Sequence, residues 1–182
     1  MGETVIQVSS LGKRIKGKTI LEEISFEINK GDCVALIGPN GAGKTVLMSC
    51  ILGDKKPSSG QVLIDGKAGK AKNKIAVLLQ ENTIPNSLKV EELIAFFQSI
   101  SDNPLTNQVV QDLLQFKEDQ YQQFADKLSG GQRRLLAFVL CLIDKPKILF
   151  LDEPTAGMDT STRQRFWEIV NDLKKAGTTI LY

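Results

Sequence analysis

The chain has 182 residues, 42% of them apolar and 24% charged, which is typical of a soluble globular protein and enough for one well-formed domain. Its 23 basic and 21 acidic side chains nearly cancel, so we expect no sequence-independent binding of nucleic acid or anionic lipid. Histidine is absent, and Cys33, Cys50 and Cys141 lack the paired spacing of a metal site. We therefore interpret the cysteines as small buried hydrophobes in a reducing compartment.

The beginning of the chain carries no targeting signal, because Met1 to Ser10 mixes charge and polarity without an apolar core. The longest apolar run, Leu135 to Ile143, is far shorter than the about 20 residues of a membrane helix. We expect a protein that is soluble by itself and that works at a membrane only through a partner.

The first predicted elements are half-buried strands. Thr4 to Val8 and Ile24 to Ile28 alternate apolar and polar residues, which indicates an antiparallel β layer. A turn at Lys30-Gly31-Asp32 then leads into Val34 to Ile37, which is predicted to be a buried parallel strand.

The pattern G-x-x-x-x-G-K-T follows this strand and precedes a helix predicted over Thr45 to Leu52. Its glycines let backbone N–H groups turn toward phosphate oxygens at the positive end of the helix. Lys44 is expected to reach the β- and γ-phosphates, and the Thr45 hydroxyl to coordinate Mg²⁺. The predicted nucleotide site consists of Gly38, Pro39, Asn40, Gly41, Ala42, Gly43, Lys44 and Thr45, followed by Val46, which offers its backbone N–H.

Two further strands are predicted after this helix. Val62 to Ile64 is short and leads into a lysine- and glycine-rich segment, 66 to 74, interpreted as an exposed loop. Ile75 to Leu79 is a buried strand that ends at Gln80. Ligands of open α/β sheets sit beyond the carboxyl ends of strands, although a glutamine there can equally do no more than end its strand.

From Asn82 to Tyr121 the pattern becomes helical. One helix is predicted to carry Glu91 and Glu92 in its first turn, and a second to open at Asn103-Pro104. Their apolar stripes are expected to belong to the core, and consist of Leu93, Phe96, Phe97 and Ile100, then Val109, Val110, Leu113, Leu114 and Phe116. We interpret residues 82–127 as a helical insertion in an α/β domain.

Leu128-Ser129-Gly130-Gly131-Gln132 stands directly ahead of a helix predicted over Arg133 to Ile143. Ser129 and Gln132 have the spacing of a capping box, and the paired glycines leave backbone N–H groups open to an anion. From the residues alone both interpretations stay open, and capping is the simpler one.

Lys147 to Asp152 is a second buried strand that ends in a carboxylate. In a phosphate-loop protein such an aspartate can hold Mg²⁺, and Glu153 is then placed to polarise an attacking water as a general base. After a turn at Gly157 to Asp159, an amphipathic helix is predicted over Thr160 to Lys175 and a final strand over Thr178 to Leu181.

The order GPNGAGKT (38–45), Gln80, LSGGQ (128–132), ILFLDEP (148–154) and AGMD (156–159) resembles the nucleotide-binding domain of ABC (ATP-binding cassette) transporters, across nearly the whole chain. The resemblance implies an α/β fold, namely a phosphate-loop NTPase core with a mainly parallel sheet, an N-terminal antiparallel β layer and a helical subdomain at about 82–127. It also implies that residues 1–182 form a single ATPase domain.

The resemblance further implies a site shared by two copies that pack head to tail around two ATP molecules. Ser129, Gly131 and Gln132 of one copy would approach the γ-phosphate held by the other, and Asp159 would bridge the copies. The helical subdomain would meet a transmembrane permease subunit, which places the chain in the cytoplasm against the inner face of the cell membrane.

At the reacting centre, the resemblance implies that Gln80 senses the γ-phosphate and Mg²⁺. Asp152 would support the metal together with Thr45, and Glu153 would act as the base.

The sequence departs from the family pattern in three places. The residue after the loop threonine is often a second hydroxyl in the family, whereas Val46 offers only its backbone N–H. Where family members usually place an aromatic ring under adenine, Ile15 offers only an apolar contact. The family's switch histidine usually follows a strand like Thr178 to Leu181, and the chain stops at Tyr182, so we interpret it as a piece of a longer polypeptide. We therefore expect this chain to bind ATP and to hydrolyse it weakly or not at all.

The predicted function is the ATP-binding and ATP-hydrolysing subunit of an ABC transporter. The motif TAGMD (155–159) favours the bacterial exporter type. The alternative is a non-transport cassette acting on ribosomes or nucleic acid, which the single cassette and the lack of basic excess disfavour. A phosphate-loop kinase would leave LSGGQ unexplained. The membrane subunit, and not this chain, would choose the cargo.

Overall fold

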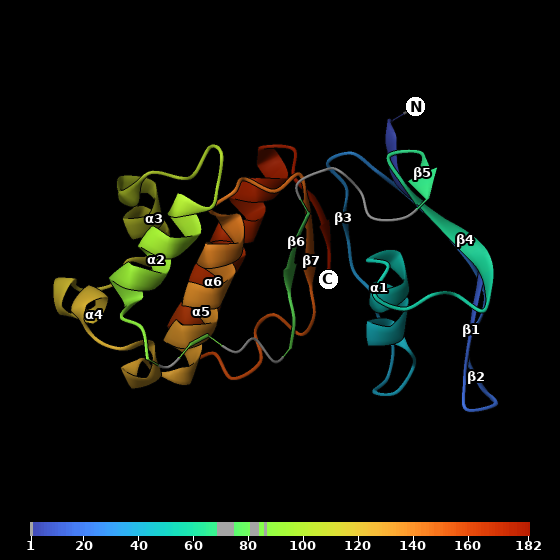
Figure 1. The fold of residues 1–182 in the computed structure, drawn as a ribbon, viewed down its shortest axis with the longest axis horizontal. Coiled ribbons are helices and arrows are strands. Elements are labelled where there is room, and N and C mark those ends of the chain that lie inside the picture. The colour runs from blue at the N-terminus through green and yellow to red at the C-terminus, as the bar shows by residue number, and fades with distance from the viewer. Residues whose placement is uncertain (1, 69–74, 81–83, 86) are drawn as a thin grey trace.

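The computed structural model describes residues 2–68, 75–80, 84–85 and 87–182. Figure 1 shows two sheets and a set of helices stacked in layers. Helix α1 (Lys44–Ile51) lies between the two sheets, and the remaining helices cover the far face of the second sheet.

The first sheet is antiparallel, with strand order β2-β1-β4-β5. Its strands are β1 (Thr4–Ile15), β2 (Lys18–Asn29), β4 (Ser59–Ile64) and β5 (Lys67–Ala68). The predicted antiparallel layer is thus confirmed, but β1 and β2 are longer than the alternation indicates. Register shifts, including one between Val8 and Leu11, break the period of two within the paired strands and so hide their continuation.

The second sheet is parallel, with strand order β3-β8-β7-β6. Its strands are β3 (Cys33–Val34), β6 (Ile75–Leu78), β7 (Ile148–Leu151) and β8 (Thr179–Leu181). Alternate residues of β7 enter different cores. Ile148 and Phe150 pack with α1 and the first sheet, whereas Leu149 and Leu151 pack with the helices of the other face.

Two long helices, α5 (Gly130–Leu142) and α6 (Thr160–Lys175), lie directly on that other face (Figure 1). Outside them lie α2 (Val90–Ser99), α3 (Asn107–Leu114), α4 (Glu118–Gln122) and a short 3₁₀ turn, Ala125–Lys127. No described helix is long and apolar enough to cross a membrane.

The predicted buried strand Val34 to Ile37 is wrong in its extent. Only Cys33 and Val34 belong to β3, and the Leu36 N–H donates to the Tyr182 carbonyl as the chain leaves the sheet. Ile37 is 93% exposed, because β3 is at the end of the strand order and the residues after it run out toward the next loop.

The helical part also differs from prediction. Helix α3 begins at Asn107 and not at Pro104, because Thr106 is its N-cap and accepts from the Val109 N–H, while the Leu105 N–H bonds to the Ile143 carbonyl at 2.9 Å. The apolar stripe of α2 is narrower than expected. Phe96 is 53% and Ile100 65% exposed, since the buried face is made by Val90, Leu93 and Ile94.

Two other predictions are only partly confirmed. Val109 is partly exposed although it was expected in the core. Cys50 is buried, whereas Cys33 and Cys141 are only partly so, and all three are free thiols. In the predicted exposed loop 66–74, Lys67 and Ala68 form β5, and residues 69–74 lie outside the described part.

Candidate functional site

The loop 38–43 joins β3 to α1 at the edge where the parallel strands end (Figure 1). Gly43 has φ 93°, a backbone conformation that favours glycine, and a Cβ there would lie 2.9 Å from Leu21 Cδ2 and would have to displace that methyl group. The Lys44 ammonium donates to the carbonyls of Gly38 at 2.7 Å and Pro39 at 3.1 Å. The loop therefore holds a cation over the start of α1, where free N–H groups favour an anion.

Thr45, at the second position of α1, contacts the end of β7. Its hydroxyl donates to Asp152 Oδ2 at 3.0 Å, and Asp152 is buried. These are hard oxygen donors of the kind Mg²⁺ takes, and Mg²⁺ usually completes its shell with phosphate oxygens and waters. Among the residues that the structure describes, no group of three or more histidine, cysteine, aspartate or glutamate side chains could hold a metal ion.

Gln80 and Glu153, the two predicted catalytic residues, lie side by side at the ends of the neighbouring strands β6 and β7. Gln80 Nε2 donates to Glu153 Oε2 at 2.9 Å. Glu153 has φ 43°, a left-handed conformation that is costly for any residue with a Cβ. That conformation ends the strand sharply and places the carboxylate beside the amide.

The capping box predicted at Ser129 is confirmed. Ser129 Oγ accepts from the Gln132 N–H at 3.2 Å, and Gln132 Oε1 accepts from the Ser129 N–H at 3.1 Å. Gly131 is buried, and a Cβ there would lie 3.1 Å from Asp159 Oδ2. Glycine thus lets the turn before α6 pack against α5, while a contact of this motif with a phosphate stays a prediction.

Asp159 is the N-cap of α6. Its Oδ1 accepts from the Thr162 N–H at 3.0 Å and from Ser161 Oγ at 2.7 Å, and its Oδ2 from Thr162 Oγ1 at 2.7 Å. The backbone bond from Thr162, with these two hydroxyl bonds, holds the pKa of Asp159 well below its usual range. A bridge between copies through Asp159 stays a prediction.

The two remaining predicted residues lie at the border of the site. Val46 is partly buried and packs into the core between α1 and the first sheet. Ile15 is partly exposed at the end of β1, beside the turn to β2, so its contact with adenine stays a prediction.

One residue of the site was missed from the sequence. Arg134 of α5 is buried, and its guanidinium bonds to backbone carbonyls at the ends of β6 and β7. Burial lowers the pKa of Arg134. The signal that could have found it is a charged residue that directly precedes the apolar run Leu135 to Leu140 in the same helix.

Comparison with known proteins gives consistent matches. The family described as ABC transporter matches residues 21–156. The chain is 30% identical over 191 residues to a probable multidrug ABC transporter ATP-binding protein of Escherichia coli (strain K12), covering 99% of this chain and 33% of that protein. It is 34% identical over 188 residues to the Nod factor export ATP-binding protein I of Ralstonia nicotianae, covering 97% and 58%. The chain thus spans between a third and about three fifths of these relatives.

Solved structures agree with the fold. An ATP-binding subunit of an ABC transporter superposes with a TM-score of 0.83 at 25% identity, covering 98% of this chain and 78% of the other. An ATP-binding cassette solved as a dimer in a post-hydrolysis state with ADP and Pi gives a TM-score of 0.81 at 20% identity, covering 97% and 86%. The second match supports the phosphate-loop NTPase fold alone.

Proposed function

Because this chain belongs to the ABC transporter family of ATP-binding domains, we propose that it binds ATP, hydrolyses it only weakly by itself, and serves in ATP-driven transport by a membrane subunit. The observation that carries the proposal is the convergence of two polar pairs at one edge of the parallel sheet. Thr45 meets Asp152, and Gln80 meets Glu153, beside the loop that presents Lys44. This supplies a phosphate cradle, oxygen donors for a metal and a carboxylate base within one site.

The proposed reaction is in-line attack of water on the γ-phosphate, with catalysis mainly by positioning and charge stabilisation. Lys44 and the loop N–H groups bind the phosphates. Thr45 and Asp152 would hold Mg²⁺, with Gln80 near it, and the metal would neutralise phosphate charge. Glu153 takes the proton of the attacking water, and Gln80, which donates to that carboxylate, orients it.

The proposed partners follow from the same surface. The amino end of α5 and the loop 38–43 lie at the same edge of the molecule but on opposite sides of the parallel sheet (Figure 1). A head-to-tail second copy could therefore place its Ser129, Gly131 and Gln132 over the phosphates held here. The region 82–127 is the proposed subdomain of a single ATPase domain, and its outer helices would meet the permease at the cytoplasmic face of the membrane. Two relatives named for export and multidrug transport support an exporter-type system.

The test compares Glu153→Gln with wild type, and uses Glu168→Gln on α6 as the matched control. We expect Glu153→Gln to bind a fluorescent ATP analogue with a Kd within about twofold of wild type, because glutamine keeps the shape of the site. Its single-turnover hydrolysis should fall by at least about 100-fold, because the amide cannot accept the proton. Glu168→Gln should match wild type in both measurements.

Two results would count against the proposal. One is a wild-type chain that does not bind ATP at all. The other is a Glu153→Gln variant that hydrolyses bound ATP at the wild-type rate.

A further inference from the structure

The guanidinium of Arg134 donates hydrogen bonds to five backbone carbonyls at the ends of two neighbouring strands. An arginine carries five N–H donors in a fixed fork. Its Nη1 donates to the carbonyls of Leu79 and, at 3.0 Å, Gln80, which follow β6. On the other side Nη2 donates to Asp152 at 2.9 Å and Glu153 at 3.3 Å, and Nε to Pro154 at 3.2 Å, all of which follow β7.

These carbonyls begin where the sheet stops. The bond from the Asp152 N–H to the Leu78 carbonyl, at 2.8 Å, lies at the end of the β6–β7 pairing. Gln80 and Glu153 lie directly beyond it, one on each segment. Past the last backbone bond of the β6–β7 pair, the guanidinium of Arg134 joins the two segments. It thereby fixes the backbone positions of Gln80 and Glu153, which carry the catalytic amide and carboxylate.

The same side chain belongs to the helix that Ser129 caps. Arg134 lies five residues after Ser129, in the second turn of α5. Its neighbour Arg133 donates to the Ile84 carbonyl at 3.1 Å, which gives α5 a further bond to the segment that follows β6. A displacement of the first turns of α5 therefore pulls directly on the backbone of Gln80 and Glu153.

We propose that Arg134 is a positioning residue that links the LSGGQ end of α5 to the Gln80–Glu153 pair. The amide of Gln80 and the carboxylate of Glu153 then keep their relative position only while α5 is packed against the ends of β6 and β7. This inference rests on the proposed ATPase function. Arg134 touches no substrate in this role, and it acts through the carbonyls it binds.

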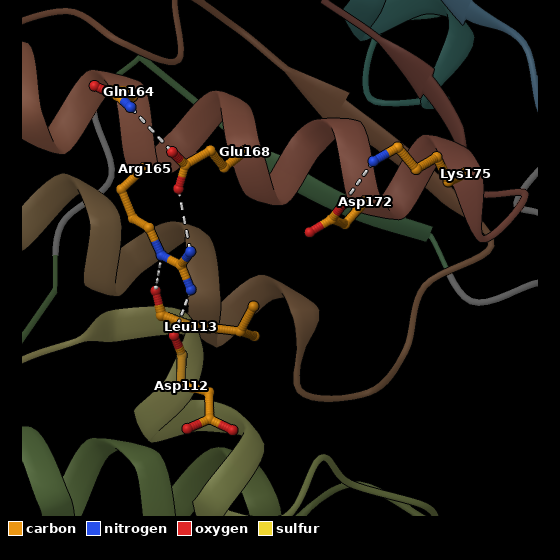
Figure 2. A network of polar contacts seen from close by, with 7 residues as sticks. All are labelled: Asp112, Leu113, Gln164, Arg165, Glu168, Asp172 and Lys175. Carbon is orange, nitrogen blue, oxygen red and sulfur yellow. Dashed lines mark hydrogen bonds and ion pairs between the residues drawn. The ribbon is translucent and has the colours of Figure 1, made fainter.

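A second arginine, Arg165, serves as a control, because it also donates to backbone carbonyls but joins α6 to α3, away from the nucleotide loop. Figure 2 shows Arg165 of α6 reaching the end of α3, where it donates to the carbonyls of Asp112 and, at 3.1 Å, Leu113. It also pairs with Glu168 at 3.2 Å. Arg165 thus has the same chemistry, a guanidinium on backbone carbonyls between two elements, without contact to Gln80 or Glu153.

The experiment compares Arg134→Lys and Arg165→Lys with wild type in the full chain. Lysine keeps the charge but has three donors on one nitrogen, so it cannot bridge five carbonyls. For Arg134→Lys we expect amide exchange to accelerate at least about fivefold around Leu79 and at Asp152, while exchange in α1 is unchanged. Single-turnover hydrolysis should slow at least about tenfold, and the Kd for ATP should stay within about twofold.

Arg165→Lys should accelerate exchange only near the end of α3 and leave hydrolysis unchanged. The proposal is overturned if Arg134→Lys hydrolyses at the wild-type rate, if exchange changes at neither strand end, or if both lysine variants slow hydrolysis alike. Failure of the proposed function is distinguishable, because it would appear as no ATP binding by wild type. Amide exchange would then still decide whether Arg134 holds the two strand ends.

Discussion

Lys44 holds its ammonium against the carbonyl oxygens of Gly38 and Pro39, so in this structure it is already placed over the loop that should receive phosphate. A charge-assisted hydrogen bond contributes about 1.5–3 kcal/mol, so Lys44→Ala should weaken ATP binding by about 10- to 100-fold. A fluorescent ATP analogue, titrated into each protein, measures the change.

Lys175→Ala is the control for this measurement. Lys175 pairs with Asp172 on the surface of α6, and both side chains are largely exposed, so its loss should leave ATP affinity unchanged. Equal affinity of the Lys44→Ala variant and wild type would show that the loop does not bind phosphate through this ammonium.

The depressed pKa of Asp159 predicts how the stability of the protein depends on pH. Its folded-state pKa is depressed, first by the Thr162 N–H and then by two hydroxyls, relative to an unfolded value of about 3.9. The stability it contributes is therefore present above about pH 3.9 and is lost as the pH falls through the folded-state value. The difference in Tm between wild type and Asp159→Ala should be constant above about pH 5 and should shrink at lower pH.

Thermal unfolding followed by circular dichroism across that pH range makes this measurement. Asp159→Asn is the control, because asparagine caps a helix without titrating at this position. Its Tm should run parallel to that of Asp159→Ala at every pH. A wild-type advantage that persists unchanged in acid would contradict the assignment.

At the scale of the element, α5 depends on its capping box. Ser129→Ala removes a hydrogen bond from an otherwise free N–H, which costs about 1 kcal/mol and lowers Tm by about 2–4 °C for a protein of this size. Ser129→Asn should stay close to wild type because asparagine caps as well as serine. Denaturant unfolding of the three proteins checks the order, and a Ser129→Ala variant as stable as wild type would refute it.

Element boundaries were predictable where local signals decide them. The extent of α6 matches the prediction, because Asp159 caps its start and two lysines and a glycine mark its end. The start of α3 was missed although a local signal marks it, because Thr106 is the N-cap and accepts from the Val109 N–H. The Asn-Pro pair three residues earlier offered a competing start signal, and there the Leu105 N–H bonds instead to the Ile143 carbonyl, far away in sequence.

At the scale of the whole molecule, the sequence was sufficient for the fold class and for the residues at the strand ends. Gln80 and Glu153 were predicted separately, each at the end of an apolar run, and parallel pairing of β6 with β7 brings them together. Arg134 could not be found in this way. Its acceptors lie 18 to 55 residues away in the chain, so only the folded structure shows that this charged residue of an apolar helix binds the ends of two strands.

The left-handed backbone of Glu153 has a consequence for how this position can change over time. Glycine or asparagine would adopt that conformation with less strain, so replacing the glutamate by glycine relieves about 1–2 kcal/mol of backbone energy. Stability and the placement of the carboxylate therefore oppose each other at this position. A Glu153→Gly variant should accordingly gain stability while it loses the carboxylate.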